Sequence, residues 1–273
     1  MISALVVSYE TRDLLAATLG RLLALPDPPD EVIVADNGSR DGSQEMVAAE
    51  FPGVRLLPLG ENLGFGAANN RAAAAARGDQ LLLLNSDAWP LPGTLTRLGA
   101  ALDRAPRLAL AAPLLRYPDG APQFHWAPAT GVVGEALQKL RNPFERRSWI
   151  HRLRGPGGWF TAAGALVRRA AFEAVGGFDE GFFLYFEDVD LCVRLRAAGW
   201  RLRTVPEATV IHVKGGSQSA EVESLDYRRS QLRFYARHRP AWEQRFVRAR
   251  LTRRARRLPP AEREALLALL AGS

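Results

Sequence analysis

The stretch LLLLNSD, residues 81–87, places polar side chains directly after an uninterrupted apolar run. Four consecutive leucines predict a strand that is buried on both faces, which is typical of a parallel sheet. Ligand sites of open α/β sheets lie beyond the carboxyl ends of such strands. We therefore expect Asp87 to occupy a position suited to a divalent cation, with Asn85 pointing to the same side of the strand. The alternative is a capped turn before the prolines that follow.

A second acidic cluster lies in FFLYFEDVDL, residues 182–191. Glu187 and Asp188 interrupt an aromatic and apolar stretch, where carboxylates are costly unless a cation, a hydrogen-bond partner or a reaction uses them. We expect both side chains to point to the mouth of the sheet and one of them to act as a general base. The alternative for Asp188 is a helix cap, because a helix is predicted to begin beside it.

The first 116 residues alternate strand and helix signals. Apolar runs rich in β-branched residues or leucine predict strands at 2–8, 31–35, 54–59, 81–84 and 108–115, and helical spacing predicts helices at 14–23, 44–50, 64–77 and 92–104. This alternation predicts an α/β fold with a mostly parallel sheet and helices on both faces. Residues 117–158 are rich in Pro, Gly, Trp and Arg and predict a functional loop with one short helix near 133–140.

Regular structure is expected to resume after this loop. The pattern predicts strands at 159–168, 201–205 and 209–213 and helices at 170–175 and 189–198, and it becomes helical from residue 226 onward. We therefore expect one α/β domain over 1–225, with halves 1–116 and 117–225, and a basic helical extension over 226–273.

Composition limits the class of protein. The chain has 273 residues, of which 47% are hydrophobic and 24% charged, as in a folded globular protein. Its single cysteine, Cys192, excludes an internal disulfide framework. Nothing approaches eighteen uninterrupted apolar residues, and the N-terminus has the pattern of a first strand, so we expect a cytoplasmic protein.

The net charge of +7 is concentrated near the C-terminus. Residues 226–257 hold twelve arginines against two acids, so the body of the chain is slightly acidic and we expect no nucleic-acid partner. Trp242, Phe246 and Ala249 recur at helical spacing in this segment. A basic amphipathic helix of this kind predicts a peripheral membrane contact. The alternatives are helices packed on the sheet or a dimer contact.

Three further motifs each have two interpretations. Asp36 ends a predicted strand, where it would contact a ribose or base or else form an Asx-turn. The stretch NLGFGAANN, residues 62–70, is not a dinucleotide fingerprint, because it follows the third strand and Asn69 replaces the third glycine. Gly64 would allow either a ligand or a packed strand to approach. His212 would be a metal ligand that suits Mn²⁺ better than Mg²⁺, or a core residue.

Taken in order, these segments resemble the inverting, GT-A-fold glycosyltransferases of family 2, particularly the bacterial rhamnosyltransferase-like branch. The resemblance covers roughly residues 1–220 in unbroken order. It rests on the motifs at 6–9, 36–39, 62–66, 84–87, 176–180 and 185–191, and on His212 with Gly215 and Ser217.

The resemblance implies different roles for the two halves of the domain. Residues 1–116 would bind the nucleotide and 117–225 would carry the acceptor site and the base. Contacts to the nucleotide-sugar would come from Tyr9, Glu10, Asp36, Asn62, Gly64, Asn85, Ser86 and Asp87. Asp87 and His212 would hold Mn²⁺ or Mg²⁺, Asp188 would be the catalytic base, Glu187 would help to orient the acceptor, and Trp159 would offer it an aromatic face or else pack in the core.

The implied activity is sugar transfer from a nucleotide diphosphate, either dTDP-rhamnose or a UDP-sugar, to a saccharide or lipid-linked acceptor in cell-surface polysaccharide synthesis. One alternative is a sugar nucleotidyltransferase, which would usually show a glycine-rich basic loop where this chain has Ser8-Tyr9-Glu10-Thr11. The other is a non-catalytic nucleotide- or sugar-binding module, which would have no need of Asp87, Asp188 and His212 together.

Overall fold

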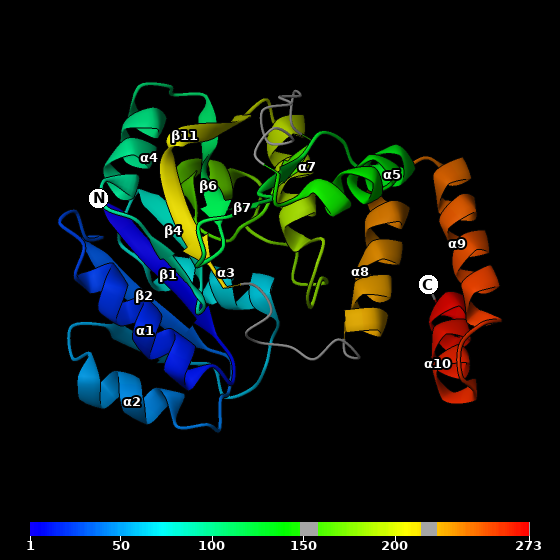
Figure 1. The fold of residues 1–273 in the computed structure, drawn as a ribbon, viewed down its shortest axis with the longest axis horizontal. Coiled ribbons are helices and arrows are strands. Elements are labelled where there is room, and N and C mark those ends of the chain that lie inside the picture. Colours follow the sequence, from blue (N-terminus) through cyan, green and yellow to red (C-terminus); the bar gives the residue numbers. More distant parts are fainter. Residues whose placement is uncertain (148–157, 214–222, 273) are drawn as a thin grey trace.

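The computed structural model describes residues 1–147, 158–213 and 223–272, and Figure 1 shows their arrangement. Gly215, Ser217 and residues 148–157 of the predicted loop lie outside the described residues. The N-terminal part consists of β1 (Ile2–Ser8), α1 (Arg12–Leu23), β2 (Glu31–Asp36), α2 (Ser43–Glu50), β3 (Arg55–Pro58), α3 (Phe65–Ala75), β4 (Gln80–Asn85), β5 (Ala88–Pro90), α4 (Thr94–Asp103) and β6 (Leu108–Arg116).

The elements that follow are shorter until α7. They are β7 (Pro122–Gln123), β8 (Trp126–Ala127), α5 (Gly131–Arg141), the 3₁₀ turn η1 (Asn142–Phe144), β9 (Trp159–Phe160), β10 (Ala165–Arg168), α6 (Arg169–Ala174), α7 (Glu187–Ala197), β11 (Arg201–His212), α8 (Glu223–His238), α9 (Ala241–Ala255) and α10 (Pro260–Ala271).

Among the described residues, nine strands form one sheet in the order β3-β2-β1-β4-β10-β6-β11-β5, with β7 paired to β6. The pairings β1–β2, β2–β3, β1–β4 and β6–β11 are parallel, as the alternating pattern predicts. β10 runs antiparallel to both β4 and β6 and joins the two parallel parts into a mixed sheet. The α/β prediction is confirmed, and the sheet is more mixed than the sequence indicates.

The four leucines of β4 are fully buried, and they alternate between the two faces of the sheet. Leu82 and Leu84 pack in the core beneath α1, α2 and α4, whereas Leu81 and Leu83 pack in the core beneath α3, α6 and α7. The helices therefore cover both faces, and the apolar run ends where β4 leaves the core at Asn85.

Two strand predictions are corrected. Residues 159–168 form two strands in different sheets, because β9 pairs with β8 and the chain then turns at Gly164 (φ +84°) into β10. Residues 201–213 form one strand, β11, up to His212, whose register shifts between Thr204 and Thr209. Pro206 lies in this interval and lacks the amide that a regular ladder requires.

The C-terminal helices are confirmed and share a core. α8, α9 and α10 gather at one side of the molecule, away from β1 and β2 (Figure 1). Their buried residues join Phe182 and Val189 in one apolar cluster, which attaches the three helices to the start of α7. α8 begins at Glu223, three residues before the predicted extension, and the division into domains stays a prediction. Across the described helices, none combines the length and apolar character needed to cross a bilayer.

Candidate active site

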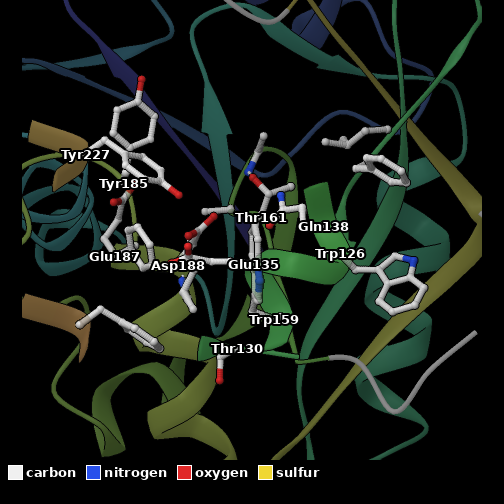
Figure 2. Close-up of a pocket in the computed structure, with 18 of the residues that line it drawn as sticks. Trp126, Thr130, Glu135, Gln138, Trp159, Thr161, Tyr185, Glu187, Asp188 and Tyr227 are labelled. Carbon is white, nitrogen blue, oxygen red and sulfur yellow. Dashed lines mark hydrogen bonds between the residues drawn. The ribbon is translucent and has the colours of Figure 1, made fainter. Parts of the chain in front are cut away.

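A cavity of about 480 Å³ opens at the carboxyl end of β4, between β9, α5, the start of α7 and the start of α8 (Figure 2). Five of the predicted site residues line it, although they come from four separate segments of the chain: Asn85, Trp159, Glu187, Asp188 and His212. β11 runs parallel to β6 and pairs with β5, which brings His212 opposite Ala88, shortly after Asn85 in the chain.

The turn before α7 positions the two acids. Tyr185 (φ 67°) and Phe186 (φ 66°) both adopt the left-handed conformation, which costs a non-glycine residue roughly 1–3 kcal/mol. Ring contacts hold the turn, because Phe186 lies 5.2 Å from Tyr227 and 5.3 Å from Phe234 between ring centroids. The strained turn ends the apolar segment abruptly and places Glu187 and the residue after it in the first turn of α7, facing the cavity.

The acid pair has unusual protonation equilibria. Burial and the neighbouring charge of Asp188 raise the pKa of Glu187 well above its ordinary value. Glu187 Oε2 is buried and has no hydrogen-bond partner among the described residues. Burial also raises the pKa of Asp188, to about 6, against the opposing effect of hydrogen bonds from the backbone of Val189 and Ala162 and from Thr161. Asp188 therefore ionises as the pH rises through about 6, whereas burial beside it disfavours the ionised form of Glu187.

A second polar group lies where β4 and β11 end. His212 Nε2 is 3.4 Å from Asp87 Oδ1 and 3.3 Å from Asn85 Nδ2. On its other side, His212 Nδ1 lies 2.7 Å from Gln123 Oε1. Because an amide oxygen only accepts, Nδ1 carries the proton, and Nε2 can accept a hydrogen bond from Asn85 Nδ2 while Asp87 Oδ1 lies nearby.

This donor set fits a divalent cation. An imidazole whose Nδ1 is held by an outer hydrogen bond, and whose Nε2 lies near a carboxylate oxygen, is an arrangement that protein metal sites use. No group of three or more His, Cys, Asp and Glu side chains converges anywhere in the described part of the chain. Asp87 and His212 would therefore supply two ligands, which suits a cation that completes its shell with phosphate oxygens and water.

Asp36 lies at the end of β2 and is fully buried. Its Oδ1 accepts hydrogen bonds from the amides of Gly38 and Ser39 and from Gln44 Nε2, which confirms the turn-forming interpretation. Its Oδ2 is buried without a hydrogen-bond partner among the described residues. One oxygen thus builds the turn, and the contact of Asp36 to a nucleotide stays a prediction.

Tyr9 and Glu10 follow β1 beside this turn. Tyr9 is exposed, and Glu10 has a left-handed backbone (φ 53°). The Glu10 amide donates to Ser39 Oγ, and Glu10 Oε1 accepts from the Arg40 amide, so the turns after β1 and β2 are tied together. Both residues lie at the carboxyl edge of the sheet, where a nucleotide contact is geometrically open to them.

Asn62, Gly64 and Ser86 have structural contacts of their own. Asn62 Oδ1 accepts from the Gly64 amide, and a Cβ on Gly64 would lie 2.2 Å from the carbonyl oxygen of Phe183. Close backbone packing therefore accounts for this glycine. Ser86 is buried and accepts a hydrogen bond from Thr11 through its hydroxyl. Their roles toward a nucleotide stay predictions.

The cavity also contains residues that the sequence analysis did not single out. Trp126 pairs through β8 with the strand of Trp159, and Thr161 hydrogen-bonds to Asp188. Figure 2 also shows Thr130, Glu135, Gln138, Tyr185 and Tyr227. Only Trp126 had a signal, since a tryptophan inside a loop with predicted function is a candidate contact. The place of the others in the site follows only from the structure, in which α5 and α8 enclose the cavity.

Comparison with known proteins shows the family to which the chain belongs. Residues 3–176 match the model of glycosyl transferase family 2, and residues 146–257 match that of glycosyl transferase family group 2. The chain is 36% identical over 238 residues to the N-acetylglucosaminyl-diphospho-decaprenol L-rhamnosyltransferase of Mycobacterium tuberculosis, covering 80% of this chain and 78% of that protein.

Two solved structures share the fold. One is a mannosyltransferase from Pyrobaculum calidifontis in complex with GDP-mannose and Mn²⁺, with a TM-score of 0.62 and 20% identity over 99% of this chain and 79% of that chain. The other is GalNAc-T7 with UDP, GalNAc and Mn²⁺, with a TM-score of 0.62 and 15% identity over 98% of this chain and 54% of that chain.

The mixed sheet flanked by helices has the GT-A fold of these two structures. The chain belongs to glycosyltransferase family 2, in its rhamnosyltransferase-like branch.

Proposed function

We propose that the chain transfers a sugar, with inversion, from a nucleotide diphosphate donor to a hydroxyl of a lipid-linked saccharide in cell-surface polysaccharide synthesis. The similarity to an L-rhamnosyltransferase favours dTDP-rhamnose as the donor of this chain, and a UDP-sugar is the alternative. The observation that carries the proposal is the buried acid pair at the cavity, with Asp188 ionised near neutral pH.

Asp188 is the base in this proposal. The acceptor hydroxyl attacks the anomeric carbon from the face opposite the nucleotide, its proton passes to Asp188, and the bond to the nucleoside diphosphate breaks. A base whose pKa lies near the working pH combines ionisation with a useful proton affinity. Glu187, whose Oε2 has no hydrogen-bond partner among the described residues, would help to orient the acceptor, and the face of Trp159 would receive the sugar ring.

Asp87 and His212 would hold Mn²⁺ or Mg²⁺, with the nucleotide diphosphate completing the shell. The cation would stabilise the negative charge that develops on the leaving diphosphate. Two observations support this assignment: the proximity of His212 Nε2 to Asp87 Oδ1, with Nδ1 held by Gln123, and the Mn²⁺ in both structural relatives. Because the acceptor would be lipid-linked, we place the enzyme at the inner face of the cell membrane.

The test is a thermal-shift panel of UDP, dTDP, GDP and CDP, each with Mn²⁺, Mg²⁺ or a chelator. A ligand at about 100 times its dissociation constant stabilises the folded state by about 2.7 kcal/mol. We expect a metal-dependent shift with dTDP or UDP, lost in Asp87→Ala and kept in Asp188→Asn. The absence of any shift with all four nucleotides would contradict the proposal.

A further inference from the structure

A second cavity, of about 1070 Å³, lies between α5, α8 and α9. It shares Glu135 and Tyr227 with the candidate active site, so the two cavities adjoin. Figure 1 shows α8 and α9 side by side, with α5 near their ends. Six cationic side chains line this cavity, which we call the basic groove: Lys139, Arg228, Arg250, Arg253, Arg254 and Arg257.

The basic groove contains far more positive than negative charge. Its lining includes one carboxylate, Glu135, which already accepts hydrogen bonds from Arg250 Nη2 at 2.8 Å and from the Tyr235 hydroxyl at 2.9 Å. In the described part of the chain, no other acidic side chain forms an ion pair with a cation of the groove. Cations gathered in this way are stabilised by an anion that several of them can contact at once.

Arg228 shows the effect of this crowding. Its side chain is half-buried over the ring of Tyr227, 5.0 Å from the ring centroid. Burial lowers the pKa of Arg228, and the charges of Arg254 and Arg250 lower it further. An anion in the groove would offset the cost of burying this charge and the repulsion between the arginines.

The first half of α9 adds apolar side chains at the edge of the groove. Phe246 lines it and is 48% exposed, and Trp242, one helical turn away, is 58% exposed. Aromatic side chains of this size are rarely left in water without a partner when they lie next to one another. A ligand that carries both an anion and an apolar chain would contact the arginines and these two rings.

We propose that the basic groove binds the diphosphate of a lipid-linked acceptor while the acceptor's sugar enters the adjoining cavity and reaches Asp188. The acid pair, the arginines of the groove and the exposed aromatic rings would then receive the acceptor's sugar, diphosphate and lipid. This inference rests on the proposed function, and it adds the residues that recognise the acceptor's anionic link. The groove is concave and lies between helices, so it suits a single diphosphate better than the plane of a bilayer.

The test compares two double variants. Arg254→Gln with Arg257→Gln removes two cations of the groove, and both side chains are exposed without an ion pair among the described residues. Arg245→Gln with Arg256→Gln is the matched control, because these exposed arginines of the same segment lie outside the groove lining. Both variants lose the same net charge.

The first readout is the dissociation constant for farnesyl diphosphate, which carries the diphosphate and an isoprenoid without a sugar. We expect the groove variant to bind it roughly ten- to a hundredfold more weakly, since each charge-assisted hydrogen bond to phosphate is strong. The control variant should change by no more than about twofold, as expected for screened distant charges. Equal losses in both variants, or no loss in the groove variant, would overturn the proposal.

The second readout is transfer to two acceptors, N-acetylglucosaminyl farnesyl diphosphate and octyl N-acetylglucosaminide, which lacks the diphosphate. The groove variant should have a higher KM for the first and an unchanged KM for the second. If the unsubstituted protein glycosylates neither acceptor, the proposed function is contradicted, whereas farnesyl diphosphate binding still decides the groove. Weaker binding to phosphatidylglycerol vesicles with unchanged farnesyl diphosphate affinity would make the groove a membrane contact and overturn the proposal.

Discussion

Replacing Asp188 by asparagine should stabilise the folded protein while it removes most of the activity. The pKa of Asp188 rises from an ordinary 3.8 to about 6 on folding, because the carboxylate is buried. This difference corresponds to about 3 kcal/mol in favour of the neutral form. An asparagine is neutral at every pH, so the variant avoids the cost of a buried charge. Its turnover should fall by about 10²–10⁴-fold if Asp188 is the base.

The pH determines when this stabilisation is seen. A carboxyl whose pKa is raised by folding contributes full stability below the unfolded-state pKa and loses it as pH rises through the folded-state pKa. The cost of ionised Asp188 is therefore absent below about pH 3.8 and complete above about pH 6. We expect Asp188→Asn to raise the free energy of unfolding by about 1–3 kcal/mol at neutral pH, less than the full amount because the amide accepts fewer hydrogen bonds.

Urea unfolding of both proteins across this pH range is the assay. Asp13→Asn is the matched control, because Asp13 has the same side chain with 94% exposure, and it should change stability by no more than about 0.5 kcal/mol. The reasoning would be refuted if Asp188→Asn were no more stable than the unsubstituted protein at neutral pH, or if its advantage did not shrink toward acid pH.

Three further predictions concern the base, the metal site and the fold. The kcat/KM should rise with pH up to about 6 and then level off, as ionised Asp188 accumulates, and a pH-independent value through this range would contradict the base assignment. His212→Ala should weaken Mn²⁺-dependent binding of the nucleoside diphosphate by about 10–100-fold in a titration, while binding in chelator should not change. Gly64→Ala should destabilise the fold by about 2–4 kcal/mol in urea, because its Cβ would meet the Phe183 carbonyl. Gly60→Ala, which has a similar φ of +80° and open space, should cost only about 1–2 kcal/mol.

Much of the fold can be predicted from the sequence, because local patterns of apolar residues coincide with burial. The four leucines of β4 are buried on both faces, as an uninterrupted apolar run indicates. The strand pairing is harder to predict, since β10 pairs with β4 across more than eighty positions of sequence and with β6 across more than fifty. The three-residue strand β5 is too short to have a periodic signal, and it forms only because β11 offers an edge to pair with.

The candidate site, like the fold, could be predicted from the sequence only in part. Polar residues that interrupt apolar runs, such as Asn85 and Asp188, are visible in the sequence and do meet in one cavity. Gln123, which orients His212, carries no such signal, because its role depends on the distant placement of β7 and β11. The left-handed turn at Tyr185 and Phe186 is also hidden, since aromatic residues rarely adopt that conformation and tertiary packing imposes it.

The most direct test of the central claim is the anomeric configuration of the sugar newly attached to the acceptor. The protein would be incubated with dTDP-rhamnose or a UDP-sugar, Mn²⁺ and N-acetylglucosaminyl farnesyl diphosphate, and the product examined by the carbon–proton coupling at its anomeric carbon. The account predicts a glycoside whose configuration is opposite to that of the donor, formed by the unsubstituted protein and lost in Asp188→Asn. A product that retains the donor configuration, or equal product from both proteins, would contradict it.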